Sequence, residues 1–124
     1  MDEKQRQELF GELKSLLAEF GDVLVIGGEG TKYSLSTTKP IEVDGKLHEG
    51  YYFAGLRELK NIVGFYFMPI YICPELRERV PTSLQKILKG NTCFNFKKLT
   101  PELANDLKEM MNVGIETYRN KGWI

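Results

Sequence analysis

The hexapeptide Gly64-Phe65-Tyr66-Phe67-Met68-Pro69 contains the centre of the strongest predicted strand, which spans residues 62–68. Phe65 and Phe67 fall on one face of this strand and Tyr66 and Met68 on the other, because successive side chains of a strand point to opposite sides of a sheet. A strand with one face in water normally alternates apolar with polar residues. Aromatic residues on both faces therefore indicate that both faces are covered or that one of them lines a pocket.

Predicted helices and further strands flank this stretch. Residues 2–20 and 100–120 carry apolar side chains at helical spacing, and Asp2 and Thr100 are suitable N-caps. Apolar or alternating runs predict further strands at 23–26, 31–37, 41–43, 46–48, 51–56 and 93–96. Asp44-Gly45 predicts a type I′ hairpin turn. A short helical excursion is expected between Pro69 and Gly90, with a helix over 83–89 that has Thr82 as its N-cap and Gln85 in its capping box.

The order of these elements predicts an α+β fold. Strands joined by tight turns form antiparallel sheets, and two long amphipathic helices can cover one face of such a sheet. We therefore expect a two-layer sandwich in which the N-terminal and C-terminal helices pack on the same face of the sheet. A length of 124 residues fits a single domain, residues 1–124.

Composition argues against several classes of function. Lysine plus arginine and aspartate plus glutamate number 17 each, so the net charge is zero and a dedicated nucleic-acid binder is not expected. The charged N-terminus lacks the apolar run of a signal peptide, and no stretch is long enough to span a membrane, so the cytoplasm is the expected location. The two cysteines, Cys73 and Cys93, lack CxxC spacing and are expected to be reduced, with a disulfide or a reactive thiol as the alternative.

The second face of the central strand provides the first functional hypothesis. Tyr66 and Met68 share that face with each other, and Cys93, Asn95 and Lys97 alternate in the same way on the last strand. An apolar surface with a few polar groups is the usual form of a ligand site. These five residues are therefore the candidate binding site of a non-catalytic module for a small molecule or a protein. The alternative is that these side chains belong to the core.

Two other functions have some support from the residues. Cys93 and the single histidine, His48, form a nucleophile and a base if folding brings them together, although no catalytic motif surrounds either residue. A role in protein interaction would require an exposed apolar patch, either on an uncovered sheet face or around Trp123-Ile124. The oligomeric state is not indicated by the sequence.

A family resemblance covers the chain from about Tyr51 onward. It rests on the hexapeptide above, on the run Leu88-Lys89-Gly90-Asn91-Thr92-Cys93-Phe94-Asn95-Phe96-Lys97-Lys98, and on a closing helix that reaches Tyr118. These segments resemble the YdhG-like family of small bacterial domains, most of which have no known function.

The resemblance implies a frataxin-like α+β sandwich, and it implies an iron-chaperone role as an alternative function. Iron would then be a ligand, held by acidic side chains along the first helix and at the start of the first strand. The candidates are Glu8, Glu12, Glu19 and Asp22, since carboxylate oxygens suit hard cations.

Overall fold

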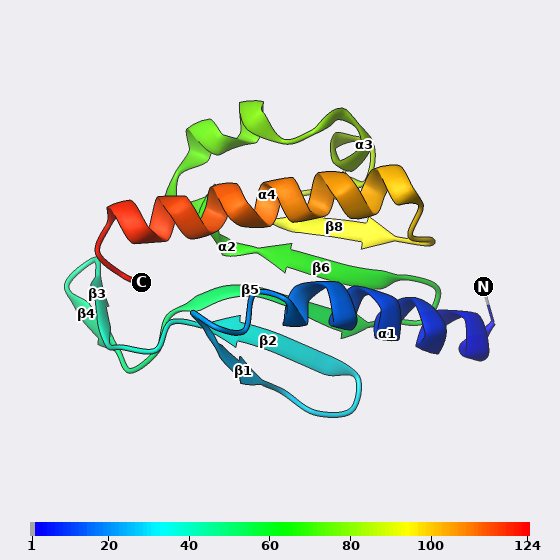
Figure 1. Ribbon diagram of the computed structural model, residues 1–124, viewed down its shortest axis with the longest axis horizontal. Coiled ribbons are helices and arrows are strands. Elements are labelled where there is room, and N and C mark those ends of the chain that lie inside the picture. The colour runs from blue at the N-terminus through cyan, green and yellow to red at the C-terminus, as the bar shows by residue number, and fades with distance from the viewer. Residues whose placement is uncertain (1) are drawn as a thin grey trace.

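The computed structural model describes residues 2–124 and is built on one large sheet (Figure 1). Within these residues the sheet has six antiparallel strands in the order β1-β2-β5-β6-β8-β7. The strands are β1 Val25–Gly27, β2 Lys32–Ser36, β5 Tyr52–Glu58, β6 Val63–Phe67, β7 Leu88–Lys89 and β8 Cys93–Phe96. The predicted central strand, β6, lies between β5 and β8 in the interior of the sheet.

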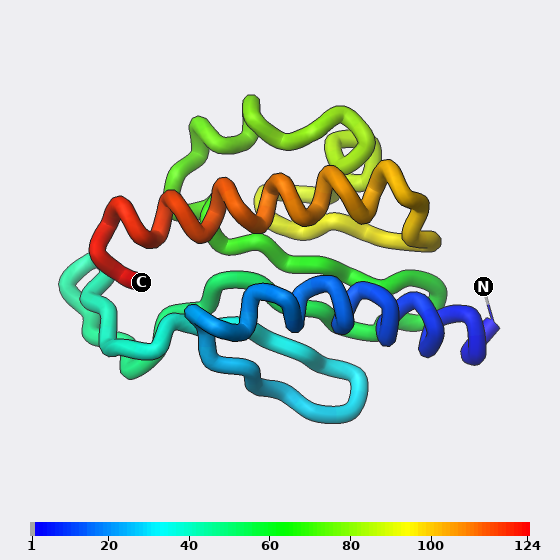
Figure 2. The backbone as a smooth tube through the Cα atoms, in the orientation of Figure 1, coloured from blue at the N-terminus to red at the C-terminus, as the bar shows by residue number. Residues whose placement is uncertain are grey.

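Two long helices, α1 (Glu3–Ala18) and α4 (Pro101–Asn120), lie side by side on one face of this sheet (Figure 1). Both N-caps are as predicted: Asp2 accepts a hydrogen bond from the backbone N–H of Gln5, and Thr100 accepts one from Leu103. The tube in Figure 2 shows that the start of α1 and the C-terminus lie at opposite ends of the molecule. The predicted α+β sandwich with both helices on one face is confirmed.

The core lies between the helices and the sheet. Apolar residues from both helices and from the middle strands are fully buried there, including Leu13, Leu17, Phe65, Phe94, Leu107 and Met111. Burying a side chain of this size contributes roughly 1.5–3 kcal/mol. An ion pair also ties α1 to the sheet, because Arg6 Nε lies 3.0 Å from Glu58 Oε1 and Arg6 Nη1 donates to the carbonyl of Lys60. The stripe of apolar residues on each helix therefore determines which face of the sheet is covered.

The predicted hairpin forms as a separate two-stranded sheet of β3 (Ile41–Val43) and β4 (Lys46–His48). Its turn residues have the positive φ values that a type I′ turn requires, 53° at Asp44 and 77° at Gly45. Beyond α4, the ring of Trp123 packs edge-on against Tyr118, with centroids 4.9 Å apart. Trp123 and Ile124 are thus packed on the core and do not form the exposed apolar patch that a protein-interaction role would need.

The segment between β6 and β8 differs from its prediction. It contains α2 (Met68–Ile72), the 3-10 helix η1 (Pro74–Arg79) and α3 (Thr82–Gln85). The helix predicted over residues 83–89 ends at Gln85, and its N-cap is Pro81 rather than Thr82. Leu88 and Lys89 instead pair with β8 as β7, because Gly90 adopts a positive φ of 69° and turns the chain back on itself. Pairing within the sheet therefore overrides the local helical pattern.

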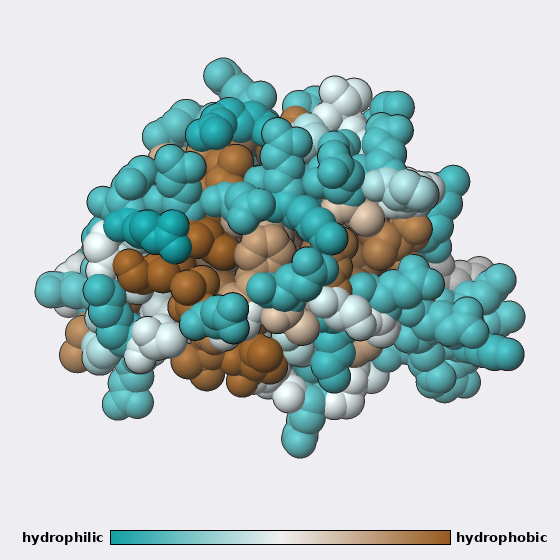
Figure 3. Space-filling view, viewed as in Figure 1, coloured by the Kyte–Doolittle hydropathy of each residue, from teal (hydrophilic) through white to brown (hydrophobic). Residues whose placement is uncertain are grey.

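The edge strand β1 exposes two apolar side chains, since Val25 is 50% and Ile26 is 53% exposed. Figure 3 shows apolar surface at the position of β1.

Within residues 2–124, no helix combines the length and the apolar character needed to cross a membrane.

Candidate functional site

The two faces of the sheet differ sharply in burial. Phe65 and Phe67 point toward the helices and are 0% and 1% exposed, whereas Tyr66, between them, is half-buried on the other side. The register places Cys93 opposite Tyr66 and Asn95 opposite Gly64, so these side chains share the face that carries Tyr66. We call this side the open face. The open face thus carries half-buried polar and aromatic groups, unlike the fully buried face beneath α1 and α4.

Two glycines on the open face lie beneath tyrosines. A Cβ placed on Gly64 would be 3.4 Å from Tyr66 Oη, and a Cβ on Gly55 would collide with the hydroxyl of Tyr52. Gly55 and Tyr66 are directly opposite each other on β5 and β6. At Gly55 only a glycine leaves room for the Tyr52 phenol to lie on the backbone of the sheet, whereas at Gly64 a Cβ would make ordinary contact with Tyr66. The two tyrosines therefore form a low aromatic platform on the open face.

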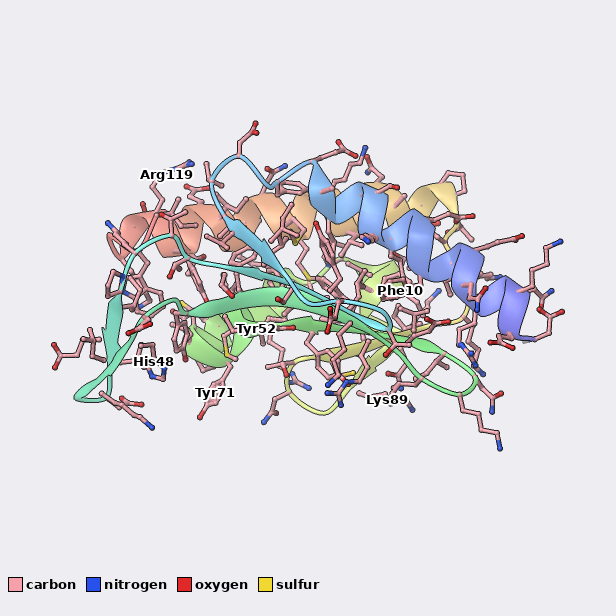
Figure 4. The ribbon with its side chains drawn as sticks, turned by 90° about the horizontal axis from the view of Figure 1, so that it is seen from below. Phe10, His48, Tyr52, Tyr71, Lys89 and Arg119 are labelled. Atoms are coloured by element: carbon pink, nitrogen blue, oxygen red, sulfur yellow. The ribbon has the colours of Figure 1, made fainter. Side chains whose placement is uncertain are left out.

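A groove of about 440 Å³ runs over this platform. Its volume lies in the range of small-molecule sites. The side chains that give it its chemical character are Lys32, Ser34, Tyr52, Arg57, Tyr66 and Met68. Figure 4 shows the sheet with α1 and α4 on one side, and the labelled Tyr71 and Lys89 lie on the opposite side. We call this feature the open-face groove.

The phenols of the open-face groove are protonated at neutral pH. Burial raises the pKa of Tyr52 to about 12, and the neighbouring Tyr66 adds to the rise while Arg57 opposes it. Burial also raises the pKa of Tyr66, and Arg57 again acts in the lowering direction. The guanidinium of Arg57, which lines the same groove, favours the ionised form of both phenols. The groove offers neutral hydroxyl groups beside a permanent positive charge.

Cys93 is a neutral thiol next to this groove. Its Sγ lies 3.4 Å from Asn95 Oδ1, and burial raises the pKa of the thiol by more than the Tyr66 hydroxyl lowers it. A reactive cysteine needs a lowered pKa, because the thiolate is the nucleophile. Cys93 therefore contributes polarity to the open face rather than nucleophilic reactivity.

The five residues predicted as a ligand site separate into two groups. Tyr66 and Met68 line the open-face groove, with Cys93 beside Tyr66. Met68 belongs to the first turn of α2, so its position differs from the strand position expected for it. Asn95 and Lys97 line a second hollow, together with Ile62 and Lys86. The structure thus assigns two of the five residues to the groove and one to its margin.

The four acidic residues predicted for iron lie in two separate places. Glu8 and Glu12 line a hollow beside Lys97 and Lys98, whose charges offset theirs. Glu19 and Asp22 line another hollow, where Glu19 Oε2 is 3.4 Å from Lys108 Nζ. In the described chain, residues 2–124, no three side chains of the histidine, cysteine, aspartate or glutamate type are grouped as metal ligands. The geometry gives the iron hypothesis no assembled site.

The proposed nucleophile and base are not paired. His48 lies in the small β3–β4 sheet, and its ring packs edge-on against Tyr51 with centroids 5.1 Å apart. Cys93 contacts Asn95 and Tyr66 in the large sheet. Over residues 2–124, no hydrogen bond joins the imidazole to the thiol. The residues of the enzyme hypothesis therefore have different neighbours.

Four of the six side chains that characterise the groove escaped sequence reasoning: Lys32, Ser34, Tyr52 and Arg57. The predicted strand 51–56 stopped one residue short of Arg57, but β5 continues to Glu58. Tyr52 was predicted within the strand 51–56 without a face. In the structure a shift of register at Leu35 and Ser36 interrupts the alternation of β5, which the sequence pattern does not show. The signal that was present is Gly55 and Gly64, since a glycine inside a strand often marks close approach of another group.

Comparisons of the chain with protein families, curated proteins and solved structures assign it to no class of protein. No protein-family model, no curated protein and no solved structure matches the chain. The resemblance to the YdhG-like family therefore stays a prediction.

Proposed function

We propose that this protein is a non-catalytic module that binds a small molecule in the open-face groove. The observation that carries the proposal is the platform of Tyr52 and Tyr66, which is half-buried on glycines while the opposite face of the sheet is fully packed. Aromatic side chains placed on a rigid sheet can bind a flat or apolar ligand with little loss of conformational entropy. Met68 adds an adaptable apolar wall at one side of the groove.

The titratable groups of the groove support binding rather than catalysis. The pKa values of Tyr52, Tyr66 and Cys93 are all raised. General bases and nucleophiles need pKa values near or below the working pH. At neutral pH these side chains therefore act as hydrogen-bond partners for a ligand.

A dye-binding titration tests this function. N-phenyl-naphthylamine is an uncharged aromatic dye whose fluorescence rises in an apolar site, and we expect it to bind the protein saturably. Tyr66→Ala should weaken this binding, whereas Tyr71→Ala should not, because Tyr71 is 61% exposed and does not line the groove. Met68→Ala provides a second groove variant if Tyr66→Ala lowers the melting temperature too far.

A screen of small apolar acids for displacement of the dye would then identify ligands. Saturable binding that neither Tyr66→Ala nor Met68→Ala changes would rule out the open-face groove as the site.

A further inference from the structure

Lys32 and Arg57 face each other across β2 and β5. They are register partners in the antiparallel pair, and both side chains line the open-face groove. Like charges at directly opposite positions destabilise a sheet. This placement therefore has an energetic cost that the fold itself does not require, since uncharged residues would pair there more favourably.

These two cations have no acidic partner in the described chain. The ion pairs found in residues 2–124 are Arg6 with Glu58 and Lys108 with Glu19, and neither involves the groove. The residues that line the groove include no aspartate or glutamate. Within the described residues, the strands of the large sheet contain one acidic residue, Glu58. It lies on the helix side of the sheet, where it pairs with Arg6. The groove is thus a locally basic site on a chain of zero net charge.

We infer that the ligand of this groove is an aromatic anion, with Lys32 and Arg57 binding its negative group and Tyr52 and Tyr66 contacting its ring. This inference rests on the proposed function and adds the chemical class of the ligand. A guanidinium binds carboxylate and phosphate groups in a bidentate way, and an ammonium adds a second charge. Phenol rings beside these cations provide the flat apolar surface that an aromatic group needs. Either a carboxylate or a phosphate monoester fits this chemistry.

A single molecule fits the observations better than a nucleic-acid strand. The groove holds about 440 Å³, enough for a small ligand. The neutral balance of 17 basic and 17 acidic residues lacks the basic excess typical of a domain that follows a phosphate backbone.

Two matched dyes test the inference. Anilinonaphthalene sulfonate has the ring system of N-phenyl-naphthylamine with one added anionic group. We expect Lys32→Gln and Arg57→Gln each to weaken binding of the sulfonate roughly threefold to tenfold, as for a charge-assisted contact near the surface. The same variants should change the affinity for the uncharged dye less than the affinity for the sulfonate, because only the sulfonate loses a charge–charge contact. Lys39→Gln and Lys46→Gln, which remove equal charge from exposed positions outside the groove, serve as controls.

The outcomes separate the inference from the function it rests on. If Tyr66→Ala weakens both dyes but the cation variants change neither, the inference fails and the proposed function stands. If Tyr66→Ala and Met68→Ala weaken neither dye, the proposed function fails and the inference with it. Competition by naphthoate and by adenosine monophosphate then distinguishes a carboxylate from a phosphate. Displacement of the sulfonate by a single-stranded oligonucleotide at concentrations where both small anions fail would overturn the inference.

Discussion

Gly114 of α4 lies directly against the ring of Phe67 of β6. A Cβ at Gly114 would be 2.6 Å from Phe67 Cζ and 3.0 Å from the Cζ atom of Phe53. Real side chains do not approach so closely, so the helix can reach this depth only because residue 114 has no side chain. The contact places α4 firmly on the middle of the sheet, and this packing leaves the open face as the exposed one.

Gly114→Ala should destabilise the protein. The alanine would gain up to about 1 kcal/mol of helix propensity. Overpacking a buried site of this kind costs about 1–3 kcal/mol, because Phe67 is 1% exposed and has little room to move. We therefore expect a net loss of up to about 2 kcal/mol, measured as a lower midpoint in urea unfolding.

Gly11→Ala is the matched control and should have the opposite effect. Gly11 lies inside α1, and a Cβ there would meet nothing within 4 Å. The substitution should raise the free energy of unfolding by up to about 1 kcal/mol. Equal changes in the two variants would show that packing against Phe67 does not decide the effect.

Tyr33→Phe should stabilise the protein. The ring of Tyr33 is packed in the core, but its hydroxyl is buried and has no hydrogen-bond partner within the described residues. Leaving a buried polar group unpaired costs about 1–3 kcal/mol. Removing the hydroxyl while keeping the ring should therefore raise the free energy of unfolding by about 1 kcal/mol, seen as a higher melting temperature. A clear loss of stability would indicate that the hydroxyl has a partner in solution.

Most of the helices and strands could be predicted from the sequence, because the residues that specify them lie close together along the chain. Caps at Asp2 and Thr100, the turn at Asp44-Gly45 and the apolar stripe of each helix act through residues a few positions apart. The short strand β7 was missed because its formation depends on Phe94, which pairs with Leu88 across a turn. Where a distant partner decides the structure, the residues around a position predict the wrong element.

In the candidate site, too, residues specified by a local pattern were predicted and residues brought together by distant pairing were not. Tyr66 was found from the alternation within one strand, which a sequence displays directly. The pair of Lys32 and Arg57 was not found, because only the register of β2 with β5 brings these residues together. That register depends on loop geometry and on the irregularity at Leu35 and Ser36. No pattern along the chain records which residues face each other across two strands.

Stability should fall steeply in alkaline solution, and Tyr52 should account for part of the fall. Its pKa is raised from 10.0 to about 12 in the folded protein, so the folded state retains a proton that the unfolded chain has lost. The resulting stabilisation is fully present below pH 10 and is lost as the pH rises through about 12.

Tyr52→Phe should therefore reduce the decline of the urea midpoint between about pH 10 and 12, and it should remove a late component from the absorbance titration of tyrosine. At pH 8 neither protein should show any dependence on this group, which gives the reference measurement. An equally steep alkaline decline in both proteins would show that Tyr52 does not retain its proton.

Glu75→Gln should make Cys73 more reactive. The thiol of Cys73 donates a hydrogen bond to Glu75 Oε1 over 2.8 Å, and this bond is the main cause of the raised pKa of Cys73. An amide lacks the negative charge that disfavours the thiolate, so the pKa should fall toward its ordinary value and the thiolate fraction at pH 8 should rise. Alkylation of Cys73 by iodoacetamide should therefore become several-fold faster. The rate is measured by mass spectrometry of the peptide that contains residue 73.

Cys93 provides the internal control in the same sample. Burial, and not a carboxylate, raises the pKa of its thiol, so its rate of alkylation should be equal in the two proteins. Acceleration at both cysteines would indicate that the substitution loosens the fold. An unchanged rate at Cys73 would show that the hydrogen bond to Glu75 does not control this thiol.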